Sequence, residues 1–196
     1  MPYKFIIAAG NHDRDCCPVM LPLPDGCGIS GDVILSDGNG TKIRAQYSRS
    51  HEAGAALTFV LNGLPAGSER EYAVTGNNSE NGVSLIEKKD SIDVLIEGKY
   101  FTSYVYGGGY AKPFVGPVVG SNGESYTRLD FKTPEHPHHR SVWIAVGDVN
   151  GVDFWNEPEG CYGRQIHQRF DGLISGPVYA RISASNTWTD FSGTRL

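Results

Sequence analysis

The sequence has few cysteines and no long apolar run, and each scarcity limits what the protein can be. No stretch approaches the roughly 18 apolar residues that a membrane-spanning helix needs, and the short apolar run near the start lacks a signal-peptide cleavage site. The four cysteines are Cys16, Cys17, Cys27 and Cys161. Their spacing matches neither a disulfide framework nor a Cys-x-x-Cys metal site. We therefore expect a cytoplasmic protein with reduced thiols.

Positive charge is also scarce. The chain has 17 Lys and Arg against 22 Asp and Glu, a net charge of −5, and no basic run. A protein that binds nucleic acid needs a basic face to contact phosphates. The expected partner is therefore a small molecule or a carbohydrate, with no nucleic acid and no membrane.

A helical period is missing as well. Short β-rich runs alternate with turn residues instead, as at Asp37-Gly-Asn-Gly40, a strong hairpin signal. The expected strands lie in residues 4–9, 31–37, 41–48, 55–64, 70–76, 82–89, 91–106 and 177–189. This spacing predicts an all-β fold, an antiparallel β-sandwich, rather than a βαβ fold.

Residues 76–82 are polar or turn-forming and have no apolar anchor. They predict a small N-terminal β-module, residues 1–78, followed by a larger β-sandwich domain, residues 79–196. The alternative is one sandwich with a long loop. Because residues 190–193 predict a turn, and a second strand begins as the chain stops, we expect either a sandwich domain that is truncated at its C-terminus or a short tail.

Four of the six histidines fall between His136 and His167. In an extended segment His136 and His138 project from one side and His139 from the other. Two histidines on one face are a common way to hold a divalent metal. We expect a metal site of His136, His138 and His167, with Glu135 and Asp153 as other candidates for the third ligand.

A metal-free alternative uses the same segment. One histidine acts as a general acid or base, and Arg140 binds an anionic or carbonyl oxygen. The bland alternative is that these side chains only brace an irregular loop. The cofactor stays open between no metal and a divalent metal.

The segment continues into a predicted hairpin, with strand-like residues 141–146 and a turn at residues 148–151. Alternation places the apolar face of Val142, Ile144 and Val146 against Val152 and Phe154 in the core. The opposite face then carries three side chains that suit a sugar, an aromatic platform beside a carboxylate. They are Trp143, Asp153 and Trp155. In the alternative, both tryptophans are core residues beneath a second sheet.

Two cations flank a glycine- and proline-rich stretch before the histidines. Lys112 and Arg128 are candidates for contacts with an anionic substrate, and simple solvation is the alternative for each. The glycine run at 107–109 lacks the Gly-Lys-Ser/Thr ending of a phosphate loop.

Several blocks together resemble the bacterial PmoA-like family, which carries the label methane oxygenase. The blocks are Lys112-Pro-Phe, Gly116-Pro-Val-Val, Asn122-Gly, Thr127-Arg, residues 135–140 and 147–157, and, in the N-terminal half, Arg14, Pro18-Val, Gln46, Leu64–Gly67 and Arg70–Tyr72. The family commonly has Asp where Glu135 stands, so the carboxylate is preserved. The resemblance implies a soluble β-sandwich associated with bacterial sugar utilisation, usually in a longer chain, and provides no catalytic residues.

The leading functional expectation is an enzyme, or a degenerate relative of one, that acts on a carbohydrate or a sugar-derived carbonyl compound. The candidate catalytic residues are His136, His138, His139, Arg140 and Asp153; those for substrate binding are Lys112, Arg128, Trp143 and Trp155. One alternative is a carbohydrate-binding β-sandwich without catalysis. The other is a metal-dependent oxygenase, as the family label suggests.

Overall fold

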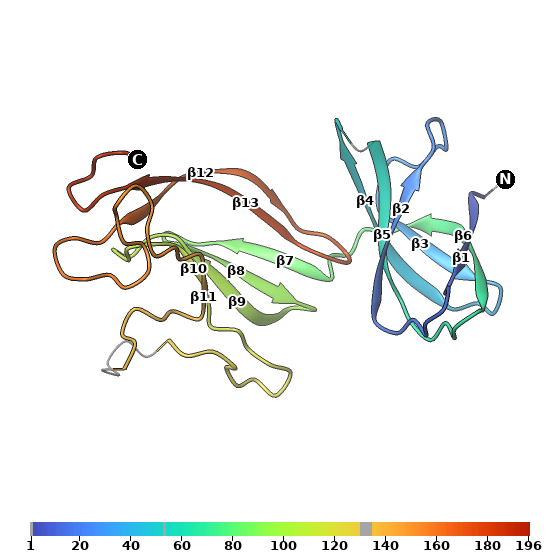
Figure 1. The fold of residues 1–196 in the computed structure, drawn as a ribbon. Helices are drawn as coiled ribbons and strands as arrows, with labels where there is room; N and C mark the ends of the chain where they lie inside the picture. Colours follow the sequence, from blue (N-terminus) through green and yellow to red (C-terminus); the bar gives the residue numbers. More distant parts are fainter. Residues whose placement is uncertain (1, 53, 130–134) are drawn as a thin grey trace. The chain divides into compact units, whose positions relative to one another are not determined.

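The chain is all-β and is built from antiparallel sheets, as expected (Figure 1). The computed structural model describes residues 2–52, 54–129 and 135–196. Its strands are β1 (Lys4–Ala8), β2 (Cys17–Leu23), β3 (Val33–Asp37), β4 (Lys42–Ser50), β5 (Gly54–Leu61), β6 (Glu69–Asn77), β7 (Val83–Glu87), β8 (Ser91–Ile96), β9 (Lys99–Val105), β10 (Phe114–Val115), β11 (Val142–Trp143), β12 (Arg164–Ile174) and β13 (Arg181–Thr189). Within the described ranges, no helix is long and apolar enough to cross a membrane.

The chain divides into two compact units. Unit 1 comprises residues 1–82 and 176–179, and unit 2 comprises residues 83–175 and 180–196. The boundary expected between residues 78 and 79 therefore lies inside unit 1. The sequence did not predict that residues 176–179, between β12 and β13, pack with unit 1.

Unit 1 is a curled six-stranded sheet with the strand order β1-β6-β3-β4-β5-β2. Phe5 of β1 contacts Phe59 of β5, with 6.0 Å between ring centroids, although these strands are not neighbours in the sheet. The sheet therefore curls over a shared core. The buried members of this core are Ala9, Leu23, Val33, Leu35, Ala45, Leu57, Phe59, Leu61, Leu64 and Tyr72.

β2 is absent from the predicted strands because it contains Pro18 and Pro22. Proline has no backbone N–H to donate and is tolerated in sheets mainly on edge strands. β2 lies at the edge of the unit 1 sheet and pairs only with β5. The prolines therefore mark an edge strand here, not a loop.

Unit 2 consists of a five-stranded sheet, β11-β10-β9-β8-β7, and a two-stranded sheet, β12-β13 (Figure 1). Tyr104 and Tyr106, at the end of β9, contact Phe170 of β12, with 6.3 and 5.1 Å between ring centroids. Through these ring contacts the two sheets pack on each other as two layers. After a turn at residues 190–193, Leu196 donates from its backbone N–H to the carbonyl of Trp188, 3.0 Å away.

Candidate functional site

The histidine segment forms a tight turn, not an extended strand. The backbone N–H of His139 donates to the carbonyl of His136 over 3.1 Å, which places Pro137 at the second position of a β-turn. The fixed φ of proline suits that position. The expectation that His139 lies opposite His136 and His138 is therefore wrong. Its ring centroid is 4.7 Å from that of each of the other two, which are 6.1 Å apart.

His167 does not join these three rings in the structure. It lies on β12, where its ring contacts Tyr106 and Phe170 at centroid distances of 4.6 and 4.4 Å. Among the described residues, no group of three His, Cys, Asp or Glu side chains is arranged to hold a metal ion. The residues therefore do not fit the expected metal site of His136, His138 and His167.

A cavity of about 470 Å³ opens beside the turn, and we call it the histidine cavity. It is lined by Thr127, Arg128, Glu135, His136, His139, Ser141 and Trp143. The indole of Trp143 contacts the ring of His139 with 5.1 Å between centroids. Arg128 donates to the carbonyl oxygens of Glu135 and His136 at 3.3 and 3.1 Å. The volume of the cavity falls within the range of small-molecule sites.

Two hydroxyl groups that the sequence did not single out form part of the cavity wall. Ser141 donates from its hydroxyl to Oγ1 of Thr127 over 2.8 Å, and Thr127 Oγ1 also accepts the backbone N–H of Val118 at 2.9 Å. Ser141 has a φ of +55°, which is strained for a residue with a side chain. Serine and threonine are too common in loops for their positions to have predicted this wall.

A buried charge cluster lies behind the turn. Lys112 Nζ and Arg140 Nη1 each donate to the same oxygen, Oε1 of Glu157, at 2.7 Å. The side chains of Lys112, Arg140 and Glu157 are only 1%, 14% and 12% exposed. Arg140 Nη1 also donates to the carbonyl of His138 over 3.0 Å. Lys112 and Arg140, expected to contact substrate, are thus brought together, but neither lines the histidine cavity.

Glu157 is the member of this cluster that the sequence did not select. It is 45 residues from Lys112 and 17 from Arg140, so no local spacing relates the three. The available signal was that it ends the block 147–157 that supports the family resemblance. Its φ of +55° is a further positive value at a non-glycine residue, like those of His136 in the turn and of Ser141.

Two of the three rings in the turn are held neutral. Burial lowers the pKa of His138, and the charges of His139, Lys112 and His136 act in the same direction, while Glu157 opposes them. The pKa of His139 is lowered by burial and by the charges of His136 and Arg128. A histidine with a pKa below its usual value is unprotonated at neutral pH and can accept a proton.

The predicted hairpin is present, and Phe154 of its second arm is fully buried as expected, but the first arm presents its apolar side chains to solvent. Val149 and Val152 pair across a turn in which Asn150 and Gly151 have φ values of +53° and +82°. Val142, Ile144 and Val146, expected in the core, are 53%, 69% and 40% exposed. Trp143 is half-buried instead, beside a groove between the sheets that Val142 and Ile144 also line. The large indole has more apolar surface to bury than the aliphatic side chains.

Asp153 and Trp155 do not line the histidine cavity. Asp153 Oδ1 accepts the backbone N–H groups of Trp155 and Asn156 at 2.6 and 3.1 Å, so its carboxylate closes a turn. Trp155 is 46% exposed, and Phe154 between them is fully buried. The expected sugar platform thus contributes only Trp143 to this cavity.

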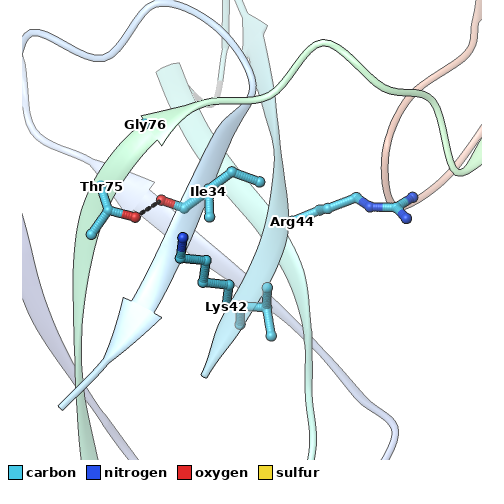
Figure 2. A pocket seen from close by; sticks show the side chains of 6 residues that line it. Ile34, Lys42, Arg44, Thr75 and Gly76 are labelled. Atoms are coloured by element: carbon cyan, nitrogen blue, oxygen red, sulfur yellow. Dashed lines mark hydrogen bonds between the residues drawn. The ribbon is translucent and has the colours of Figure 1, made fainter. Parts of the chain in front are cut away.

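Other hollows lack comparable chemistry. One of about 340 Å³ in unit 1 is lined by Ile34, Lys42, Ile43, Arg44, Thr75 and Gly76, and Figure 2 shows its two cationic side chains pointing in different directions. A hollow of about 600 Å³ in unit 2 includes Tyr100 and Tyr126. Neither lining contains a histidine, so the histidine cavity is the candidate site.

Residues 91–196 match a family model with the description "Family of unknown function (DUF6807)". The matched span contains every residue of the histidine cavity and of the charge cluster. No curated protein and no solved structure matches the chain.

Proposed function

Because the chain belongs to DUF6807, a protein family of unknown function, we propose its function from the histidine cavity itself. The chain binds a small carbohydrate or sugar-derived compound there, and a neutral histidine acts on it as an acid or base. One observation carries this proposal: a single cavity of about 470 Å³ gathers two histidines, an arginine, a tryptophan and two hydroxyl groups.

The cavity wall suits an oxygen-rich ligand. Sugars present C–H groups to aromatic surface and hydroxyl groups to polar side chains, and here Trp143 lies beside Ser141 and Thr127. At the wall the charges of Arg128 and Glu135 balance, and the buried cluster of Lys112, Arg140 and Glu157 adds a net charge of +1 behind the turn. This local positive charge, in a chain of net charge −5, favours a sugar acid over a neutral sugar.

His139 is the candidate acid or base, because it lines the cavity and its pKa is lowered. It can take a proton from a ligand hydroxyl, which converts the ring to imidazolium and leaves negative charge on the ligand oxygen. The guanidinium of Arg128 stabilises such an oxygen. The resemblance to the PmoA-like family supports the sugar class, and the low cysteine content supports a cytoplasmic location.

A metal-dependent oxygenase is the second candidate. The observation that favours it is the mutual contact of three imidazole rings, which are the commonest metal ligands in proteins. It ranks second because the described residues do not arrange three metal ligands. Elemental analysis of the purified chain, followed by titration with zinc, manganese, iron and copper, tests it directly.

The proposed function is tested by titrating the full chain with neutral monosaccharides and sugar acids while tryptophan fluorescence is recorded. We expect sugar acids to bind and to quench fluorescence. Arg128→Ala and His139→Ala should each weaken binding by about tenfold or more, as expected for loss of a charge-assisted hydrogen bond. Trp155→Phe, which alters an exposed indole outside the cavity, is the matched control.

Catalysis is separated from binding by the rate at which the sugar interconverts its anomers, because removing the proton of the anomeric hydroxyl opens the ring. Accelerated interconversion that is lost in His139→Ala supports an acid or base, whereas binding without acceleration indicates a carbohydrate-binding protein. Equal binding by the wild type and by both cavity variants would contradict the proposal.

A further inference from the structure

Glu157 holds two buried cations with one oxygen atom. Lys112 Nζ and Arg140 Nη1 both lie 2.7 Å from Oε1. The two nitrogens are therefore close neighbours, and among the described residues Glu157 is the hydrogen-bond partner of Lys112. Without the carboxylate, two positive charges would face each other in a buried place, an arrangement that is strongly destabilising.

The cluster is connected to the histidine cavity by direct contacts. The same nitrogen of Arg140 that binds Glu157 also donates to the carbonyl of His138, at 3.0 Å. The ring of His138 meets that of His139 edge to face, with 4.7 Å between centroids and an angle of 85°. His139 then lines the cavity against Trp143. A shift of Arg140 would thus be transmitted to the cavity within two contacts.

The guanidinium of Arg140 also contacts the first ring of an aromatic pair. It lies 5.5 Å from the centroid of the Tyr110 ring, which packs edge to face on Phe114 of β10 at 5.1 Å. A cation over an aromatic face is stabilised by the ring quadrupole. Arg140 is therefore held by both Tyr110 and Glu157, and it in turn holds the carbonyl of His138.

Glu157 also adopts a backbone conformation that carboxylate side chains rarely adopt, with a φ of +55°. Such strain persists only where surrounding contacts hold the residue in place. Here those contacts are the two buried cations.

We infer that Glu157 is a positioning residue of the histidine cavity: it holds Lys112 and Arg140 on one oxygen, and Arg140 holds the turn that carries His136, His138 and His139. Glu157 does not line the cavity and touches no ligand there. Its importance for ligand binding rests on the proposed function, whereas its control of the turn does not.

The test compares Glu157→Gln with the double variant Glu157→Gln/Lys112→Met. The glutamine side chain keeps the shape of the glutamate and an acceptor oxygen for Arg140, but it removes the negative charge between the two cations. Removing Lys112 as well restores the net charge of +1 that the native cluster has. Glu159→Gln neutralises an exposed carboxylate two residues away and is the matched control.

Two measurements are made on each full-length variant. The first is the NMR signals of the backbone amides of residues 135, 136 and 138–141 and of the Trp143 indole, and the second is the affinity for the sugar acid that binds the wild type most tightly. We expect Glu157→Gln to shift these signals and to weaken binding by about tenfold or more. The double variant should recover the native signals and bind within about threefold of the wild type. Glu159→Gln should match the wild type in both.

The outcomes separate this inference from the proposed function. Native signals in a folded Glu157→Gln variant would overturn the inference, as would a double variant that does not recover the native signals. If Glu157→Gln does not fold, a folded double variant with native signals supports the inference that Glu157 balances the two buried cations. If neither variant folds, the inference is overturned. If no sugar binds the wild type but the signals shift and recover as expected, the inference stands and the proposed function fails.

Discussion

His138 shows at the scale of one residue how burial makes the turn sensitive to pH. The residue is 8% exposed, and its Nε2 atom is buried without a hydrogen-bond partner among the described residues. Burial is the largest cause of its lowered pKa. The ring can remain in this environment because it is neutral, since a charged ring there would lose its hydration.

Unit 2 should therefore lose stability as the pH falls below about 6.5. The pKa of His138 is lower in the folded state than its usual value of 6.5, so the unfolded chain takes up the proton first. The stabilisation is fully present above 6.5 and is lost as the pH falls toward the folded-state pKa. Thermal melts between pH 7.5 and 5.0 measure this, and the slope should be smaller in His138→Gln. Equal slopes in the two proteins would contradict the assignment.

At the scale of an element, Phe154 packs closely against β13 and against the residue that precedes β12. Phe154 is fully buried, and its ring packs on Trp188 of β13 with 4.6 Å between centroids. Gly163 lies directly against this ring, and a Cβ atom at that position would come within 2.4 Å of Phe154 Cζ. The absence of a side chain at residue 163 is thus required by the packing of Phe154.

Gly163→Ala should destabilise unit 2 by about 1–3 kcal/mol, the usual cost of forcing extra volume into a packed core. Urea unfolding measures this free energy. Gly172→Ala, within β12, is the control, because a Cβ atom at Gly172 would meet nothing within 4 Å, and we expect it to stay within about 0.5 kcal/mol of the wild type. A similar loss in both variants would show that backbone conformation, not contact with Phe154, sets the cost.

At the scale of the whole molecule, unit 1 is built from two parts of the chain that are distant in the sequence. Gln46 is 2% exposed, and its Oε1 accepts the backbone N–H groups of Val178 and Tyr179 at 3.1 and 2.9 Å. Gly176 packs against the same side chain, since a Cβ atom there would lie 2.3 Å from Gln46 Cδ. One buried amide thereby ties residues 176–179 into unit 1.

Gln46→Met keeps the volume of this side chain but removes the acceptor. Two backbone donors then lose their partner, and we expect a loss of roughly 1–3 kcal/mol in the stability of unit 1. Hydrogen exchange should show faster exchange of the Val178 and Tyr179 amides. Gln168→Met, at an exposed position on β12, is the control. Unchanged protection of both amides in Gln46→Met would contradict this role.

The local parts of this fold follow from the sequence alone. Alternating β-rich runs and turn residues predicted β1, β3 to β7 and β13, and one predicted run, residues 91–106, forms the two strands β8 and β9. The hairpin at Asp37–Gly40 forms because Asp37 Oδ1 accepts the N–H groups of Asn39 and Thr41. These features depend on residues within a few positions of one another, where propensity and turn chemistry act. The density of histidine at residues 136–139 also indicated the site, since composition needs no knowledge of distant contacts.

Tertiary structure decided everything that depends on distant residues. Alternation in residues 142–146 shows that two faces exist, but only the second sheet determines that Trp143 is half-buried and Ile144 exposed. Glu157 and Lys112 are 45 residues apart in the sequence, and the fold brings them into contact. No local sequence pattern predicts this contact. His167 stayed apart from the other histidines for the same reason: periodicity assigns a side chain to a face, whereas the packing of whole sheets determines which faces meet.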